Sequence, residues 1–357
     1  MSSTLSPQTA PPATSRKPPW GPPQYLAVLG VPVFVLMMWT LIGWMADGPH
    51  QITRYRTGEG LDYVASKTAE GIVLVLSAVV LVKVVRDCRR ERRFLTFDVM
   101  FLICGASLFW VNGSSNFLAP YLTYSSHLVN LNDPCGHIPA VVNPDCGRIP
   151  NPVILIGGIE TFLIPGACMV FCAVAHRLRA RFPGLSRART AFLVAGLGSV
   201  AAVANEFIVI PAHIWTYPGS PISLELGGPG WMYPIFPEFI GYGLLIGFPA
   251  VMRYFRDDHG RTFVERGMDH YRPGLRKLIT LGALYFVMQA CMWIPATMFL
   301  WPMSLHQTGD GWRQVPATLN NGMCDSPLAD PVTRYGPCPG TPGFRMPVAE
   351  SLPGRSP

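Results

Sequence analysis

Long apolar runs alternate with polar connections along the 357 residues of this chain. Several runs reach about 20 residues, the length that an α-helix needs to cross the hydrocarbon core of a bilayer. Charged side chains are gathered in the connections between the runs. The pattern predicts an all-α, polytopic membrane bundle of about seven transmembrane helices, over residues 24–45, 69–85, 94–111, 153–175, 190–211, 232–252 and 278–301.

Two tails flank this predicted transmembrane domain of residues 24–301. Residues 1–23 are polar and Pro-rich, which predicts a disordered tail, and they lead directly into the first apolar run. We therefore expect that run to be retained as a helix and not removed as a signal peptide. Residues 302–357 are rich in Gly and Pro, and their apolar positions show too little periodicity to predict a fold.

The basic residues predict the orientation in the membrane. The connections 83–93, 177–189 and 253–277 hold six, five and seven Lys or Arg residues, and Arg16 and Lys17 would lie on the same side. The opposite side has only four in its loops and four in the C-terminal tail. Because cytoplasmic loops carry the excess of Lys and Arg, we expect the N-terminus inside and the C-terminus outside.

Composition agrees with a multi-pass protein of the cell membrane. Hydrophobic residues make up 49% of the chain and charged residues only 14%, a balance that ordinary soluble domains do not show. The net charge of +7 is explained by the basic loops, which favours contact with anionic membrane lipid over nucleic-acid binding. Arginine outnumbers lysine by 24 to 4, which suggests a GC-rich bacterial genome.

Four cysteines lie in the predicted outer loop and tail, where disulfides persist. Pairing between near neighbours, Cys135 with Cys146 and Cys324 with Cys338, is the simplest of three possible connectivities, and four free thiols remain an open alternative. No Cys-x-x-Cys or His-x-x-x-His pair occurs, so no metal site is predicted. Walker, GxGxxG, GxSxG and HExxH motifs are absent from the sequence, and no cofactor is expected.

Three glutamates stand alone inside apolar runs, and an ionisable side chain in a membrane segment indicates a functional site. At 1.5 Å per residue, Glu160, Glu206 and Glu238 lie roughly 8–10 Å below the outer ends of their helices. The three carboxylates would therefore share one layer. The alternative is that each is neutral and hydrogen-bonded to a neighbouring helix, which would stabilise the bundle without catalysis.

The chemistry that such a layer offers is proton transfer. Burial and a second carboxyl nearby can make one glutamate an acid and another a base. This suits reactions through carbocation or oxocarbenium intermediates on an apolar substrate that enters from the lipid. The polar connections 112–152 and 212–231 are expected to fold over the layer. Hydroxyl-orienting or pocket-forming candidates near it are Asn112, Asn116, Asn205, His213, Trp110 and Trp215.

Residues 109–132 (FWVNGSSNFLAPYLTYSSHLVNLN) and 135–154 (CGHIPAVVNPDCGRIPNPVI), followed by a helix that contains a glutamate, resemble the AveC-like spirocyclases of actinobacteria. The similar layout would extend over most of residues 24–301. The resemblance implies a membrane enzyme that closes a dihydroxy-ketone polyketide to a spiroketal. It also implies that the residues matching the motif belong to the site, namely Asn112, Asn116, Tyr124 and Asn130.

Both arguments lead to one mechanistic hypothesis. A glutamate, Glu206 or Glu238, protonates a hemiketal hydroxyl, water leaves, a second hydroxyl attacks, and another carboxylate takes its proton. Two alternatives stay open from the sequence. A membrane terpene or carotenoid cyclase would use the same kind of acid layer on a lipid substrate, and a proton-coupled transporter or heptahelical sensor would use the glutamates as a proton relay without catalysis.

Overall fold

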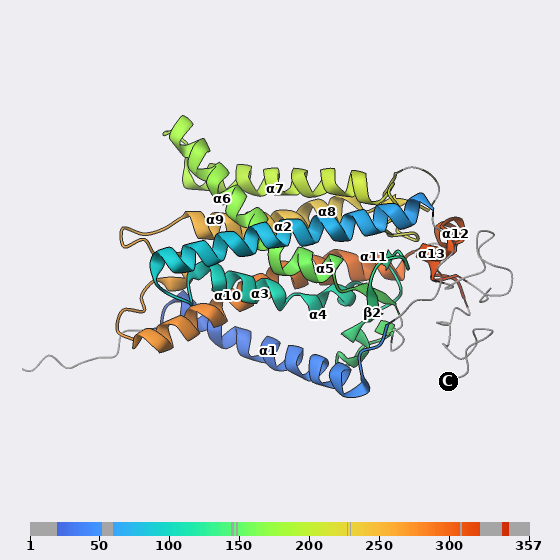
Figure 1. Cartoon of the computed structure of the whole chain (residues 1–357), viewed down its shortest axis with the longest axis horizontal. Coiled ribbons are helices and arrows are strands. Elements are labelled where there is room, and N and C mark those ends of the chain that lie inside the picture. Colours follow the sequence, from blue (N-terminus) through green and yellow to red (C-terminus); the bar gives the residue numbers. More distant parts are fainter. Residues whose placement is uncertain are drawn as a thin grey trace, which may run out of the picture.

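The computed structural model describes residues 20–51, 60–143, 146–147, 149–226, 228, 230–307, 309–321 and 338–342. Helices dominate this part of the chain and run side by side along the long axis of the molecule (Figure 1). Six helical segments are long and apolar enough to cross a membrane: Pro22–Asp47, Leu61–Glu91, Phe97–Asn116, Leu155–Arg181, Arg187–Val209 and Pro273–Leu305. The chain is therefore a helical, multi-pass membrane-type protein.

These six segments lie where six of the seven apolar runs predicted helices. At the remaining run, α8 (Ile235–Tyr242), the turn η5 (Gly243–Gly247) and α9 (Phe248–Tyr254) follow one another as a continuous helical stretch. This stretch is not among the six candidate spans. The seventh crossing and the orientation of the bundle stay predictions.

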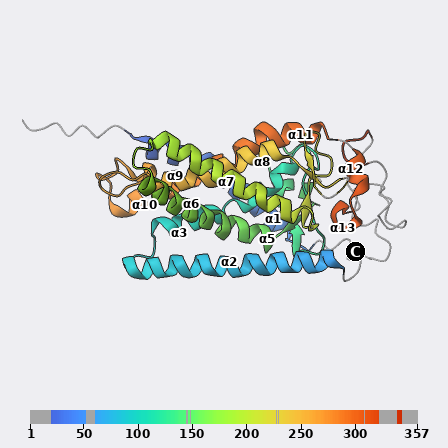
Figure 2. The same ribbon diagram turned by 90° about the horizontal axis from the view of Figure 1, so that it is seen from above.

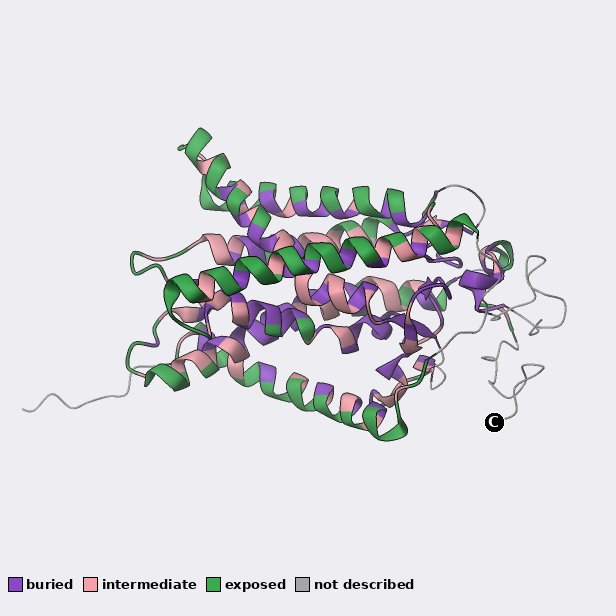
Figure 3. Ribbon diagram, in the orientation of Figure 1, coloured by how far each residue is buried: buried purple, intermediate pink, exposed green. Residues whose placement is uncertain are grey.

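Helix α2 (Leu61–Glu91) is longer at both ends than residues 69–85, the prediction from the apolar run. Its polar ends remain helical and carry ion pairs one turn apart, Lys67 with Glu70 and Lys83 with Asp87. The helix lies along one side of the bundle (Figure 2), and most of its surface is exposed (Figure 3). An apolar run predicts the part of a helix inside the hydrocarbon and not the turns that continue beyond it.

Helix α1 (Pro22–Asp47) packs along α10 (Pro273–Pro295) through small residues. A Cβ atom on Gly30 would lie 3.0 Å from the carbonyl oxygen of Gly282, and one on Gly282 would lie 3.2 Å from the Cβ of Ala27. Close approach of this kind is how helices associate in lipid, where no hydrophobic driving force acts between them. The N-terminal helix is thereby tied to the last long helix of the chain.

Three of the remaining spans are built from consecutive pieces, whereas α7 (Arg187–Val209) is a single unbroken helix. The third span joins α3 (Phe97–Ala106), α4 (Phe109–Asn112) and the 3₁₀ turn η1 (Gly113–Asn116). The other segments are α5 (Leu155–Gly158), η4 (Ile159–Leu163), α6 (Ile164–Arg181), η7 (Ala296–Leu300) and α11 (Trp301–Leu305). Three of these pieces, η4, η5 and η7, are π-helical turns.

The outer connections form short antiparallel pairs at one end of the bundle. Strand β1 (Thr123–Tyr124) pairs with β4 (Trp215–Thr216), which joins the two long connections to each other. The other pairs are β2 (Asn130–Asn132) with β3 (Pro150–Pro152), and β5 (Leu224–Glu225) with β6 (Met232–Tyr233), and the 3₁₀ turn η2 (Pro134–His137) follows β2.

Part of the C-terminal tail, for which the sequence predicted no fold, is ordered against these connections. It forms α12 (Gly309–Gln314) and α13 (Ala317–Asn320) at the outer end in Figure 1. The hydroxyl of Thr123 donates to the carbonyl of Leu319 at 2.6 Å, and the side-chain amide of Asn321 donates to the carbonyl of Tyr124 at 3.1 Å. Single anchors of this kind have no periodicity, which is why the hydrophobic pattern did not reveal them.

The three basic connections all lie at the opposite end of the bundle. There Arg253 of α9 forms a bidentate ion pair with Asp98 of α3, with both N–O distances 2.9 Å, and its third nitrogen donates to the sulfur of Cys172. The short turn η6 (Phe263–Glu265) belongs to the connection between α9 and α10. Arg253 and Asp98, a partly buried ion pair, thus link three helices at this end.

Candidate active site

A cavity of about 110 Å³ lies beneath the paired outer connections, inside the bundle. The third span, the π turns and the outer connections all contribute to its wall. Apolar residues make up more than half of the lining, as is usual for small-molecule sites. Its polar side chains are Asn112, Ser114, Ser115, Tyr124, Glu160, Trp215, Tyr217, Glu238 and Tyr242.

Glu160 lies in the wall of this cavity and is only 2% exposed. Neither of its carboxyl oxygens has a hydrogen-bond partner among the described residues. A buried carboxylate without a donor or a cation is very costly, so the neutral acid is the form that this environment favours. A neutral carboxyl facing a cavity is able to donate a proton to whatever the cavity holds.

Glu238, from α8, lies in the same wall and has a donor. The hydroxyl of Tyr217 donates to Oε1 of Glu238 at 3.3 Å. Burial, together with the nearby charges of Glu238 and Glu206, raises the pKa of Tyr217 well above its usual value, so the phenol keeps its proton. A hydrogen bond from a neutral donor stabilises the ionised carboxylate, which distinguishes Glu238 from Glu160.

Glu206 is fully buried but does not line the cavity. Its Oε2 accepts a hydrogen bond of 2.8 Å from the indole nitrogen of Trp215, whose side chain does line it. The third glutamate of the predicted layer therefore holds a wall residue in place. The three glutamates are gathered at one end of the bundle, and two of them share one cavity.

The paired strands β1 and β4 place two further predicted residues in the wall, Tyr124 and Trp215. The hydroxyl of Tyr124 lies 3.0 Å from Nδ2 and 3.1 Å from Oδ1 of Asn112, so the two side chains form a polar pair facing the cavity. Both long connections thus contribute to the site, as their polar and aromatic composition indicated.

Two of the predicted asparagines support the connection and are not in the wall. Oδ1 of Asn116 accepts hydrogen bonds from the backbone N–H groups of Tyr121 and Leu122, at 2.7 and 3.0 Å. The side-chain amide of Asn130 donates to the carbonyl of Ser125 at 2.9 Å. These bonds give both residues a structural role in the connection. A direct role in binding a substrate stays a prediction for both.

The other predicted binding residues also lie outside the lining. Asn205 is on the exposed side of α7. His213 stacks on Trp231 with ring centroids 3.8 Å apart, and its Nδ1 lies 2.9 Å from a carboxyl oxygen of Asp62. Trp110 is buried against Trp293 in the core. The structure therefore brings Asn112, Tyr124, Trp215, Glu160 and Glu238 together and leaves these three apart from them.

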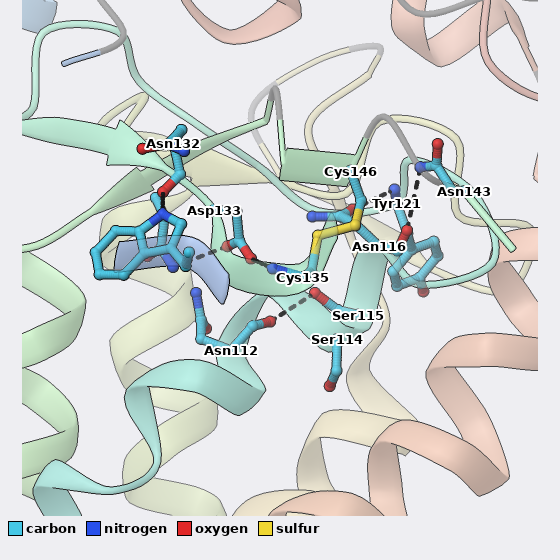
Figure 4. The surroundings of a disulfide bond; sticks show 12 residues. Asn112, Ser114, Ser115, Asn116, Tyr121, Asn132, Asp133, Cys135, Asn143 and Cys146 are labelled. Carbon is cyan, nitrogen blue, oxygen red and sulfur yellow. Dashed lines mark hydrogen bonds between the residues drawn. A yellow bond between two sulfur atoms is a disulfide. The ribbon is translucent and has the colours of Figure 1, made fainter. Parts of the chain in front are cut away.

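Asp133 holds the outer connection against Gly113, which lies between the wall residues Asn112 and Ser114 (Figure 4). Its carboxyl accepts from the backbone N–H of Cys135 at 2.7 Å and from the side-chain amide of Asn151 at 2.8 Å. It lies directly against Gly113, where an added Cβ would come within 1.9 Å of Oδ1. Burial outweighs both hydrogen bonds and raises the pKa of Asp133 to about 7.

The predicted disulfide between Cys135 and Cys146 is confirmed and closes the loop beside Asp133 (Figure 4). Cys338 is buried, whereas Cys324 lies outside the described residues, so the second pairing stays a prediction. No group of three or more His, Cys, Asp or Glu side chains in the described part of the chain is arranged to hold a metal ion.

Three π-helical turns surround the cavity, and each contributes to its wall: η4 through Ile159 and Glu160, η5 through Leu245, and η7 through Ala296 and Leu300. A proline follows two residues after each turn. Proline has no N–H group and its ring clashes with the carbonyl four residues earlier, so each proline interrupts the regular α-helical hydrogen bonding next to the turn. Within each turn, the N–H group that follows it donates to the carbonyl five residues earlier, and π turns are frequent at functional sites. The three prolines are Pro165, Pro249 and Pro302.

The profile of the family "Spirocyclase AveC-like" matches residues 91–316. The matched range is well over half of the chain and contains every residue that lines the cavity. The chain belongs to the AveC-like spirocyclase family. No curated protein sequence and no solved structure matches it. Membership implies an enzyme that forms spiroketals, and it confirms the resemblance seen in the sequence.

Within this spirocyclase, sequence reasoning missed several members of the cavity wall. Ser114, Ser115 and Tyr217 line it, although neither hydropathy nor charge distinguishes them from other loop residues. The serines are part of the GSSN segment that carries the family resemblance, which is the signal that could have revealed them. Tyr217 would have required the pairing of β1 with β4, which brings its connection over the site.

Proposed function

We propose that this spirocyclase closes a dihydroxy-ketone polyketide, or a related lipid, to a spiroketal by acid and base catalysis between Glu160 and Glu238. The observation that carries the proposal is that both carboxyls line one cavity within the matched region. Family membership supports the reaction, and the different surroundings of the two carboxyls support their roles.

Glu160 is assigned as the acid and Glu238 as the base. Glu160 has no donor among the described residues to stabilise a negative charge, whereas Glu238 accepts a hydrogen bond from Tyr217. Pairs of carboxyls whose environments differ in this way serve as the acid and the base of one reaction. The sequence suggested Glu206 or Glu238 as the acid; in this proposal Glu238 is the base, and Glu206 holds Trp215 in the wall.

The reaction begins from a cyclic hemiketal, formed when one hydroxyl of the substrate adds to its ketone. Glu160 gives its proton to the hemiketal hydroxyl. The C–O bond breaks, water leaves, and an oxocarbenium ion remains in the cavity. The second hydroxyl attacks the cationic carbon and Glu238 takes the proton that this hydroxyl loses. One molecule of water is released and no atom changes oxidation state overall, so the proposed reaction needs no redox cofactor.

The walls would decide which face of the oxocarbenium ion is attacked. The polar pair of Asn112 and Tyr124 can orient the attacking hydroxyl, and the rings of Trp215 and Tyr242 restrict the space beside it. The cavity of about 110 Å³ is smaller than the roughly 300–1,000 Å³ of pockets that enclose a drug-sized ligand. We therefore expect it to hold the reacting end of an apolar substrate whose remainder lies in the lipid.

The proposed orientation places this site near the outer face of the membrane, with the N-terminus inside and the C-terminus outside. It follows from the basic connections, which share the end of the bundle opposite to the cavity, and from the disulfide beside the cavity. Seven crossings, with α8 to α9 as one of them, are required for the two termini to lie on opposite sides.

The test is conversion of a dihydroxy ketone by the full chain in uncharged detergent, with rate and product stereochemistry measured. Glu160→Gln and Glu238→Gln should each lower the rate by about 10²–10⁴-fold, the usual contribution of a positioned acid or base. The remaining product should be the stereoisomer mixture of spontaneous closure. Glu225→Gln, a matched change on an exposed strand, should preserve both rate and stereochemistry. Unchanged rate and stereochemistry in both cavity variants would refute the assignment.

A further inference from the structure

A second cavity, of about 630 Å³, lies at the end of the bundle opposite to the proposed active site. It is bounded by the start of α3, the connection between α9 and α10, and the first turns of α10. Six cations and four carboxylates line it, an excess of two positive charges. They are Arg93, Arg253, Arg256, Arg261, Arg276 and Lys277, with Glu91, Asp98, Glu265 and Asp269.

Three of the four carboxylates are already engaged within the protein. Asp98 accepts hydrogen bonds from two guanidinium nitrogens of Arg253, as described above. Asp269 forms ion pairs with Arg261 and with Arg276, the latter at 3.6 Å. Glu265 accepts from the backbone N–H and the hydroxyl of Thr262, at 2.9 and 2.7 Å. These carboxylates therefore order the walls, and two of them, Asp98 and Asp269, pair with three of the cations.

Three cations in the wall, Arg93, Arg256 and Lys277, form no ion pair with a described residue. Arg256 is nevertheless held in place, because one of its nitrogens donates to the carbonyl of Gly260 at 2.7 Å and its guanidinium lies 5.7 Å from the ring centre of Phe97. Its remaining N–H groups keep their capacity to donate. The cavity thus combines a fixed guanidinium with two further positive side chains.

Two helices contribute their positive ends to the same place. Helix α3 begins at Phe97 and α10 begins at Pro273, and residues of the first turns of both line the cavity. The N-terminus of a helix carries about half a positive charge, which favours an anion beside it. Arginine forks match the geometry of phosphate oxygens in particular. Charge, donors and volume all favour a phosphate group.

We propose that this cavity binds a phosphate-bearing ligand through Arg93, Arg256 and Lys277. The site is separate from the spirocyclase cavity and does not depend on its chemistry. A phosphate group at this end of a membrane protein has two sources, the headgroup of an anionic lipid and a soluble phosphate compound. Bound there, the ligand would bridge α3, α10 and the connection from α9, and so stabilise the end of the bundle that Asp98 and Arg253 also join.

The experiment measures thermal unfolding of the full chain in uncharged detergent at low salt. One arm adds inorganic pyrophosphate, and the other adds short-chain phosphatidylglycerol below its micelle concentration. Sodium chloride at equal ionic strength controls for screening in the first arm, and short-chain phosphatidylcholine is the control in the second. The test variant is Arg256→Gln with Lys277→Gln. The matched control is Arg90→Gln with Arg181→Gln, which removes two exposed cations at the same end.

At least one ligand should raise the unfolding temperature of the wild type well beyond its control, with saturation. The test variant should lose that shift or need at least tenfold more ligand, and the control variant should keep it. A response to phosphatidylglycerol alone identifies a lipid site, and a response to pyrophosphate alone identifies a soluble ligand. The proposal is wrong if neither ligand acts, or if both variants respond alike, because the cations would then serve only as topology determinants.

Discussion

Replacing Asp133 by asparagine should remove a large part of the pH dependence of stability. The side chain is 3% exposed, and burial raises its pKa to about 7, from about 3.8 for an ordinary aspartate. Asparagine has nearly the same shape and can keep the hydrogen bond from Cys135. The second bond survives if the amide of Asn151 turns over, because its Oδ1 has no partner among the described residues and can accept.

The magnitude follows from the shift in pKa. The folded form binds the proton of Asp133 more tightly than the unfolded form does. This carboxyl therefore contributes most to the free energy of unfolding below pH 4. The contribution falls by about 1.4 kcal/mol per pH unit between pH 4 and 7 and is constant above that. As the pH rises from 4 to 7, the free energy of unfolding of the wild type should therefore fall by about 4 kcal/mol relative to that of Asp133→Asn.

The assay is the free energy of unfolding by SDS in mixed micelles at pH 4, 5.5 and 7. Other groups titrate in this window, so the quantity to compare is the difference between wild type and variant at each pH. Asp310→Asn, which removes an exposed carboxyl at the same outer end, is the matched control. A difference for Asp133→Asn that stays constant within about 1 kcal/mol would refute the reasoning.

Three further predictions concern the same region. Gly113→Ala should lower the unfolding temperature sharply, more than an alanine at the unobstructed Gly184, because the added methyl group would overlap the carboxyl of Asp133. Cys135→Ser should cost about 3 kcal/mol of stability by SDS unfolding because it releases a short loop, and a reducing agent should destabilise the wild type more than the variant. Trp215→Phe keeps a ring in the cavity wall but leaves the carboxyl of Glu206 without its donor; we expect a loss of about 1–3 kcal/mol by SDS unfolding, and an unchanged value would contradict it.

Helix positions could be predicted because the hydrocarbon core imposes a length and an apolar composition on anything that crosses it. The glutamates could be found for the same reason, since charge in such a segment is rare. Depth along a helix also follows from sequence, but rotation about its axis does not. Asn205 and Glu206 are neighbours at one depth, and yet one is exposed and the other fully buried.

The outer connections were the least predictable part. Their apolar residues follow no period, and their structure depends on single long-range bonds such as that of Thr123 to Leu319. The family resemblance identified the segment that includes Asn112 and Tyr124 without indicating that the two side chains face each other. Only the pairing of β1 with β4 explains why Trp215, which lies more than 90 positions after Tyr124 in the sequence, is in the same cavity wall.

Each of the three π turns around the cavity is, in terms of chain length, one residue inserted into an α-helix. Deleting one residue within 159–163 would let this helix close to α geometry with the parts before and after the turn in nearly the same rotation, because the wider π turn winds one more residue into about the same angle. Composition and hydropathy would barely change, whereas the wide turn that places Ile159 and Glu160 in the cavity wall would be lost. The shape of the cavity is therefore encoded in the number of residues per helix as much as in their identity.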